Sequence, residues 1–121
     1  AGGLNNDPVA GNGLLFIASL DQSVYAFSPL DQLPVWRYRT ASPLRGQPVF
    51  HDNTVYVPIP GEGLVAFDSI TGLRRWASPD AIGEVVAVRA GQLVTFGNGR
   101  AQLISPASGS VREDVAIPEI A

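Results

Sequence analysis

The chain has 121 residues and a formal net charge of −3 at pH 7, with 45% of its residues hydrophobic and 16% charged. This composition is typical of a folded globular chain and excludes a disordered one. The acidic balance argues against a nucleic acid or an anionic membrane as partner, because both select basic patches. The chain contains no cysteine, which excludes disulfides and thiolate metal sites.

The first predicted unit, at about residues 5–40, contains four short runs of β-forming residues. Turn-forming stretches separate these runs, namely Gly11-Asn12-Gly13, Leu20-Asp21-Gln22 and Pro29-Leu30-Asp31-Gln32. The predicted strands are 8–10, 14–19, 23–28 and 35–39.

The second predicted unit, at about 44–79, shows the same order of strands and turns. Pro58 and Pro60 are expected to end its second strand, since proline cannot donate a hydrogen bond to a sheet. The stretch Gly61-Glu62-Gly63 can supply the positive φ of a hairpin turn. The predicted strands are 48–50, 54–57, 64–67 and 73–77.

The third predicted unit lies at about 82–117, with strands at 84–88, 92–96, 101–105 and 110–116. A short helix capped by Asp80 is the alternative for 80–88. Gly83 and the valine-rich run that follows favour the strand.

A motif of the form Ala-x-Asp-x-x-Thr-Gly-x-x-x-Trp runs from Ala66 to Trp76, and a degenerate copy with Ala26 and Trp36 lies 40 residues upstream. The third unit is offset by 37 residues and has Glu113 at the tryptophan position. A fixed period of this size marks a repeat architecture. Regularly spaced short strands indicate an all-β sandwich, barrel or propeller.

These residues resemble the PQQ-like repeats of quinoprotein-type β-propellers, whose blades end in this tryptophan-docking motif. Residues 66–76 match it at every defined position, and 19–27 are similar to the hairpin that precedes it in the family. The resemblance implies an all-β fold over 1–121: a PQQ-like β-propeller segment of about three four-stranded antiparallel blades, at about 5–40, 44–79 and 82–117.

Each motif residue also has a local physical interpretation. Asp68 and Thr71 can bond backbone groups of their own turn, and Gly72 tolerates positive φ. Ala66 leaves room for a ring, so Trp76 can bury roughly 150–250 Å² against the neighbouring blade. We expect Trp76 and its counterpart in the first unit, Trp36, to be mostly buried in equivalent places.

Few side chains suggest a catalytic, cofactor-binding or metal-binding site. His51 is the only histidine and is expected in an exposed turn. Asp68 is interpreted as a turn former, and Asp21 and Glu62 as solvated turn carboxylates. Gly97-Asn98-Gly99 is followed by no helix that could receive a phosphate. We therefore expect no catalytic, cofactor-binding or metal-binding residue.

Four arginines lie on the last strands of the first two units, at positions 37, 39, 74 and 75. A propeller places these strands at its outer edge, where a solvated rim is expected and a partner-binding rim is the alternative. In the resembling dehydrogenases the quinone lies in the central channel with Ca²⁺ and frequently a vicinal disulfide. This chain has no cysteine and no recognisable ligand cluster, so no cofactor is expected.

The resulting hypothesis is a non-enzymatic scaffold or protein-interaction module of the bacterial cell envelope, periplasmic or extracellular. The alternative is a fragment of a pyrroloquinoline-quinone-dependent dehydrogenase whose active-site residues lie on other blades. The expected partners are other protein chains or the remaining blades of its own propeller, with no nucleic acid and no membrane insertion.

Three blades leave the outer faces of the first and last sheets uncovered. Candidates for the first such face are Leu15, Ile17, Val24 and Tyr25, of which strand alternation lets only some share a side. We therefore expect either a piece of a larger propeller, of seven or eight blades by resemblance, or a homo-oligomer whose copies cover one another. Glu113 could make the third blade a partial cap. The first blade would then be the end more prone to association.

Overall fold

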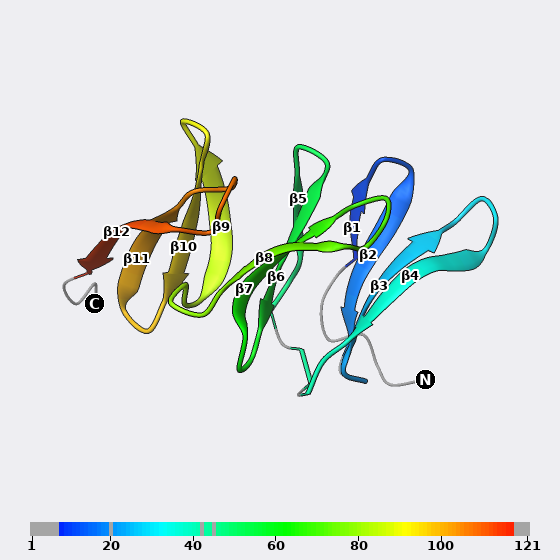
Figure 1. Ribbon diagram of the computed structural model, residues 1–121, viewed down its shortest axis with the longest axis horizontal. Helices are drawn as coiled ribbons and strands as arrows, with labels where there is room; N and C mark the ends of the chain where they lie inside the picture. Colours follow the sequence, from blue (N-terminus) through cyan, green and yellow to red (C-terminus); the bar gives the residue numbers. More distant parts are fainter. Residues whose placement is uncertain (1–7, 20, 42, 45, 118–121) are drawn as a thin grey trace.

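Twelve strands form three antiparallel sheets arranged in a row in the computed structural model, which describes residues 8–19, 21–41, 43–44 and 46–117 (Figure 1). The first sheet contains β1 (Val9–Gly11), β2 (Leu14–Ser19), β3 (Ser23–Ser28) and β4 (Leu33–Arg39). The second contains β5 (Val49–His51), β6 (Thr54–Ile59), β7 (Gly63–Asp68) and β8 (Arg74–Ser78). The third contains β9 (Glu84–Arg89), β10 (Gln92–Gly97), β11 (Arg100–Ile104) and β12 (Val111–Ala116).

Each sheet is a meander in chain order, which confirms the predicted all-β fold of three four-stranded units. Every observed strand end lies within two residues of its predicted position. Residues 80–88 form no helix, and β9 occupies their second half. The predicted start of the first unit at Asn5 lies outside the described residues.

Two-residue turns with positive φ at both positions set the register of several hairpins. This geometry matches the right-handed twist of the flanking strands and is easiest for asparagine, aspartate and glycine. The pairs, with their φ values, are Asn12 (53°) and Gly13 (75°), Asp52 (52°) and Asn53 (61°), Ala90 (50°) and Gly91 (75°), and Asn98 (52°) and Gly99 (71°).

The prediction that Pro58 ends its strand is wrong, because β6 continues to Ile59 and Pro58 pairs with Leu64 of β7. Strand β5 is short and pairs with β6 only as far as Tyr56. Beyond that point no described strand pairs with this side of β6, so the missing N–H of a proline interrupts no ladder.

The second sheet is buried on both faces. Successive residues of β6 and β7 point alternately to the first and the third sheet, so each face contributes to a separate core. The core with the first sheet contains Phe16, Ala18, Val24, Ala26, Leu44, Val55, Val57, Ile59, Val65 and Phe67. The core with the third sheet contains Tyr56, Leu64, Ala66, Ala81, Val85, Leu93 and Ile104.

One face of the first sheet packs against no other sheet among the described residues. Cross-strand pairing places Leu15 opposite Phe27 and Ile17 opposite Tyr25, and these four half-buried side chains lie on that face. Val24 was expected among the candidates for this face, but it is fully buried in the first core. The reason is the alternation of β3, which sends neighbouring residues to opposite sides.

Candidate interaction surface

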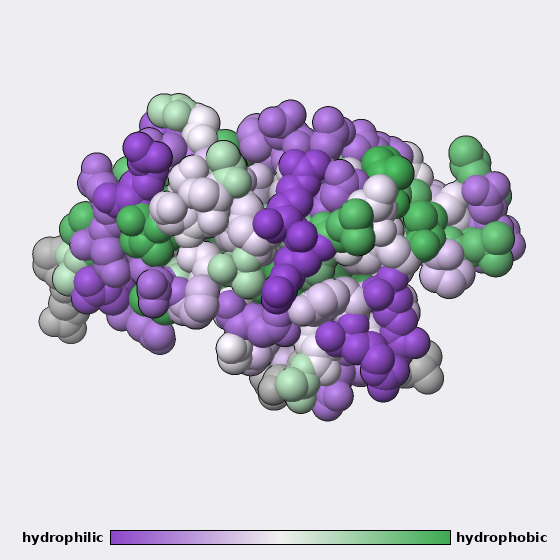
Figure 2. Space-filling model, viewed as in Figure 1, coloured by the Kyte–Doolittle hydropathy of each residue, from purple (hydrophilic) through white to green (hydrophobic). Residues whose placement is uncertain are grey.

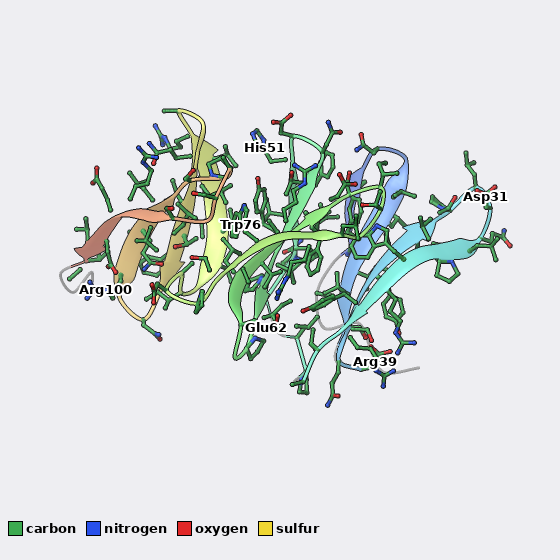
Figure 3. All side chains as sticks on the ribbon, in the orientation of Figure 1. Asp31, Arg39, His51, Glu62, Trp76 and Arg100 are labelled. Atoms are coloured by element: carbon green, nitrogen blue, oxygen red, sulfur yellow. The ribbon has the colours of Figure 1, made fainter. Side chains whose placement is uncertain are left out.

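The two tryptophans dock on the sheet that follows their own. Trp36 of β4 donates its Nε1–H to the carbonyl oxygen of Ser69 in the second sheet at 2.9 Å. Trp76 of β8 repeats this with the carbonyl oxygen of Pro106 in the third sheet, also at 2.9 Å, and Figure 3 shows it between these sheets. The equivalence predicted for the two rings is confirmed.

A glycine lies directly against each tryptophan ring, and this contact position is called the seat of the ring. Gly72 has a φ of 76° and Gly109 a φ of 79°. A Cβ on Gly72 would lie 2.5 Å from Cγ of Trp36, and one on Gly109 would lie 2.4 Å from Cε3 of Trp76. Glycine is therefore needed twice, for the left-handed backbone and for the space that the ring occupies.

Both tryptophans are half-buried rather than mostly buried. They belong to β4 and β8, which are edge strands of their sheets, so one side of each ring remains near solvent. Their inner sides pack on aromatic residues of the second sheet. The ring centroids of Trp36 and Phe67 are 5.7 Å apart, and those of Trp76 and Tyr56 are 5.8 Å apart.

Asp68 builds the turn on which Trp36 docks. Its Oδ1 accepts the N–H groups of Ile70 and Thr71, each at 2.9 Å, and its Oδ2 bonds Arg75 at 2.8 Å. The Arg75 guanidinium, followed by these two N–H donors, holds the pKa of the Asp68 carboxyl well below its usual range. Thr71 accepts the N–H of Leu73 at 3.2 Å, so the predicted turn-forming role of both residues is confirmed.

The arginines of the last strands form a solvent-exposed rim with local partners. Arg74 pairs with Glu62 at 3.4 Å, and Arg75 with Asp68. Arg37 donates to Ser23 at 3.0 Å and lies 5.3 Å from the centre of the Tyr25 ring. These groups remain accessible for contacts with another protein.

Two tyrosines connect turn carboxylates to the strands. The Tyr38 hydroxyl donates to Glu62 at 2.9 Å, across the first two sheets, and burial raises the pKa of Tyr38. The Tyr25 hydroxyl donates to Asp21 at 2.7 Å, and this bond lowers the pKa of the Asp21 carboxyl.

A polar network that the sequence pattern did not reveal is centred on Gln102, which is 2% exposed. Its Oε1 accepts the N–H of Ile82 at 2.8 Å, and its Nε2 donates to the carbonyl oxygen of Asp80 at 3.0 Å. Nε2 also contacts Asp114 at 3.1 Å, which lowers the pKa of that carboxyl. Gln102 thereby ties the connection between the second and third sheets to β11.

The first strands of the three sheets border a hollow of about 490 Å³, lined by Val9, Gln47, Pro48, Val49, Phe50, Glu84, Val85, Val86 and Phe96. Pyrroloquinoline quinone carries three carboxylates and would need cations and hydrogen-bond donors. This lining is mainly apolar and its one charged group, Glu84, is an anion that already accepts the Gln47 N–H at 3.1 Å. The residues described here do not fit the quinone.

A second cleft, of about 510 Å³, opens between the second and third sheets. Glycines and prolines dominate its lining, which consists of Gly46, Pro58, Ile59, Pro60, Gly61, Gly63, Pro79, Ala81, Ile82, Gly83, Glu84 and Asn98. Gly63 and Gly83 have positive φ and lie against backbone of neighbouring segments. The cleft is thus shaped mainly by close backbone contacts.

The remaining candidates lie apart from one another. His51 is exposed at the end of β5, and Glu62 lies at the opposite end of the second sheet (Figure 3). Within the described ranges, no three His, Cys, Asp or Glu side chains group so that they could hold a metal ion. The same ranges contain no helix with the length and apolar character of a membrane span.

Known proteins match this chain in sequence. A family model described as outer membrane protein assembly factor BamB matches residues 1–120. The outer membrane protein assembly factor BamB of Burkholderia pseudomallei (strain K96243) is 34% identical over 84 residues, and the match covers 64% of this chain and 22% of that protein. The chain therefore spans about a fifth of the length of this curated relative.

Solved structures match it in fold. BamB from Moraxella catarrhalis superposes with a TM-score of 0.75 at 17% identity, covering 95% of this chain and 36% of that one. The quinohemoprotein alcohol dehydrogenase of Comamonas testosteroni gives a TM-score of 0.75 at 16% identity, covering 93% of this chain and 21% of that one. At these identities the likeness shows a shared propeller fold alone.

Proposed function

Because the chain belongs to the PQQ-like β-propeller family described as outer membrane protein assembly factor BamB, we propose that it is part of a non-enzymatic scaffold of the bacterial cell envelope. The proposed role is to present protein-binding surfaces during the assembly of outer membrane proteins. The name of the curated relative supports this role, and a periplasmic location is proposed with it.

The proposal is supported by the contacts that the motif residues make, which are structural. Asp68 closes its turn, while Trp36 and Trp76 tie consecutive sheets together. The motif residues thus join the sheets of the propeller, and the exposed arginine rim is the proposed surface for contacts with other proteins. We propose the repeats at about 5–40, 44–79 and 82–117, with no catalytic, cofactor-binding or metal-binding residue among them.

Complementation tests this role. The protein that contains these residues is produced in a bacterium whose own BamB gene has been deleted. We expect it to restore the amount of folded outer membrane porin and the exclusion of large antibiotics. A matched variant with Gly72→Leu, which fills the seat of Trp36, should restore neither. Failure of the unsubstituted protein, when it is folded and present in the envelope, would contradict the proposal.

A second measurement separates the scaffold from a dehydrogenase. The same protein is incubated with pyrroloquinoline quinone and Ca²⁺, and its absorbance and its reduction of an electron-accepting dye with alcohol substrates are recorded. We expect neither a bound-quinone spectrum nor dye reduction. A stoichiometric quinone spectrum with turnover would establish the dehydrogenase instead.

A further inference from the structure

The turn Gly97-Asn98-Gly99 closes the hairpin between β10 and β11, whose last residue pair is Gly97 with Arg100. Asn98 and Gly99 both have positive φ, at 52° and 71°, as a two-residue turn of this kind requires. Among the five asparagines of the chain, only Asn98 and Asn12 precede a glycine. These two turns therefore place an asparagine side chain next to an unhindered backbone nitrogen.

Adjacent asparagine and glycine residues can react with each other without an enzyme. The glycine backbone nitrogen loses its proton and attacks Cγ of the asparagine, the bond from Cγ to the side-chain amide nitrogen breaks, and ammonia leaves. Water then opens the cyclic succinimide. Addition of water at Cγ gives aspartate, and addition at the main-chain carbonyl carbon gives isoaspartate, whose backbone runs through Cβ and Cγ. Glycine favours ring closure because it has no side chain in the way.

The two Asn-Gly turns have nearly the same backbone. Asn12 and Gly13 have φ values of 53° and 75°, against 52° and 71° in the second turn. All four residues are exposed, and a Cβ on either glycine would meet nothing within 4 Å. Neither glycine N–H donates a backbone hydrogen bond within the described ranges. The attacking nitrogen is therefore equally available in both turns.

The asparagine side chains of the two turns differ in their contacts. Nδ2 of Asn12 donates to Oδ1 of Asn53 at 2.8 Å and to Oγ of Ser69 at 2.9 Å. Both acceptors lie in turns of the second sheet, so the amide group that has to leave is held between two sheets. The side chain of Asn98 forms no hydrogen bond among the described residues. It can rotate until its Cγ meets the nitrogen of Gly99.

The place of Asn98 in the repeat keeps it exposed. Asp21 and Gly61 occupy the corresponding turns of the first and second sheets, and both are exposed although another sheet follows each of them. Figure 2 shows mainly hydrophilic residues at the lower end of the third sheet, where Figure 1 places the hairpin between β10 and β11. A neighbouring sheet therefore leaves this turn accessible to water and hydroxide.

We propose that Asn98 is a site of spontaneous deamidation in the folded protein, and that the hydrogen bonds of Asn12 protect the Asn12-Gly13 turn. Deamidation adds a carboxylate at the edge of the cleft between the second and third sheets, which Asn98 lines together with Glu84. The isoaspartate product also lengthens a two-residue turn by one backbone atom, which disturbs the pairing of Gly97 with Arg100. This chemistry is independent of the proposed envelope role.

Peptide mapping measures the reaction in the full 121-residue chain. The folded chain is incubated in mildly alkaline buffer made with heavy-oxygen water, and far-ultraviolet circular dichroism confirms that it stays folded. Trypsin in ordinary water then releases Asn98 in the peptide 90–100 and Asn12 in the peptide 1–37, since the chain contains no lysine. Mass spectrometry detects the heavy oxygen that replaces the amide nitrogen, and fragmentation assigns it to a residue.

We expect Asn98 to deamidate roughly tenfold or more faster than Asn12, because two hydrogen bonds of ordinary net strength must break before Asn12 reacts. The rate at Asn98 should rise with pH, as hydroxide removes the proton from the Gly99 nitrogen. Gly99→Ala has room for its Cβ and should slow the reaction at Asn98 without changing it at Asn12. Equal rates at the two asparagines, or a faster reaction at Asn12, would overturn the proposal.

Two controls assign the difference in rate to the side-chain contacts. In enough urea to unfold the chain, the two rates should become similar, because both sites are then Asn-Gly pairs in a flexible chain. Asn53→Ala combined with Ser69→Ala removes both acceptors and should raise the rate at Asn12 toward that at Asn98. An unchanged rate at Asn12 in this variant, when it is folded, would contradict the proposal, as would a reaction at Asn98 that occurs only in urea.

Discussion

The ring of Trp36 lies directly on Gly72, so that a Cβ on this glycine would be 2.5 Å from Cγ of the ring. The two residues belong to different sheets, and Trp76 repeats the relationship with Gly109 of the third sheet. The glycine of one repeat therefore contacts the tryptophan of the preceding repeat. The motif residues connect neighbouring sheets, and each connection needs residues from two repeats.

Gly72→Ala should lower the free energy of unfolding more than Gly61→Ala. Both glycines have positive φ, at 76° and 86°, but a Cβ on Gly61 has nothing within 4 Å. The control should lose about 1 kcal/mol from backbone strain. Gly72→Ala should lose roughly 2–4 kcal/mol, because overpacking against Trp36 adds to the strain. Urea denaturation measures both free energies. Equal midpoints would contradict the claim that Gly72 provides the space for the Trp36 ring.

Trp76→Ala should cost about 2–3 kcal/mol of unfolding free energy, less than the 3–5 kcal/mol of a fully buried ring, because Trp76 is half-buried. Trp76→Phe keeps a ring but removes the hydrogen bond to Pro106, and should cost about 1 kcal/mol. Guanidinium denaturation checks both values. An unchanged midpoint in Trp76→Ala would refute the docking role.

Acidification should destabilise the fold through Asp68. Its folded-state pKa is depressed, mainly by Arg75, so its contribution is fully present above the unfolded pKa of about 4 and is lost as the pH falls below it. Thermal unfolding between about pH 6 and pH 2 should therefore show a smaller pH dependence in Asp68→Asn than in the unsubstituted chain.

The control for this experiment is Asp80→Asn, at an exposed position outside the docking turn. If Asp68→Asn and Asp80→Asn behave alike, the ion pair between Asp68 and Arg75 does not stabilise the fold.

Gln102→Met should cost about 1–3 kcal/mol, since it preserves volume but leaves the partly buried N–H of Ile82 without its acceptor. Gln92→Met is the matched control, because Oε1 of Gln92 is buried without a hydrogen-bond partner among the described residues. It should be neutral to within about 0.5 kcal/mol. Chemical denaturation distinguishes the two, and equal losses would refute the importance of the Gln102 network.

Much of the fold could be predicted because its signals are local. Strand alternation, Asn-Gly turns and the 40-residue offset between Trp36 and Trp76 each depend on residues close in sequence or on a fixed period. The turn role of Asp68 could be predicted for the same reason, since its partners lie two to seven residues away.

The sequence by itself thus determined the number of sheets, their strand order and the equivalence of the two tryptophans. Only the tertiary structure decided that each ring seats on the following sheet, that Val24 is buried, that Pro58 lies within a strand and that Gln102 anchors a connection. The physical reason is that these features depend on which groups another sheet or strand places beside a residue. A strand pattern specifies two faces, and packing between sheets decides what each face meets.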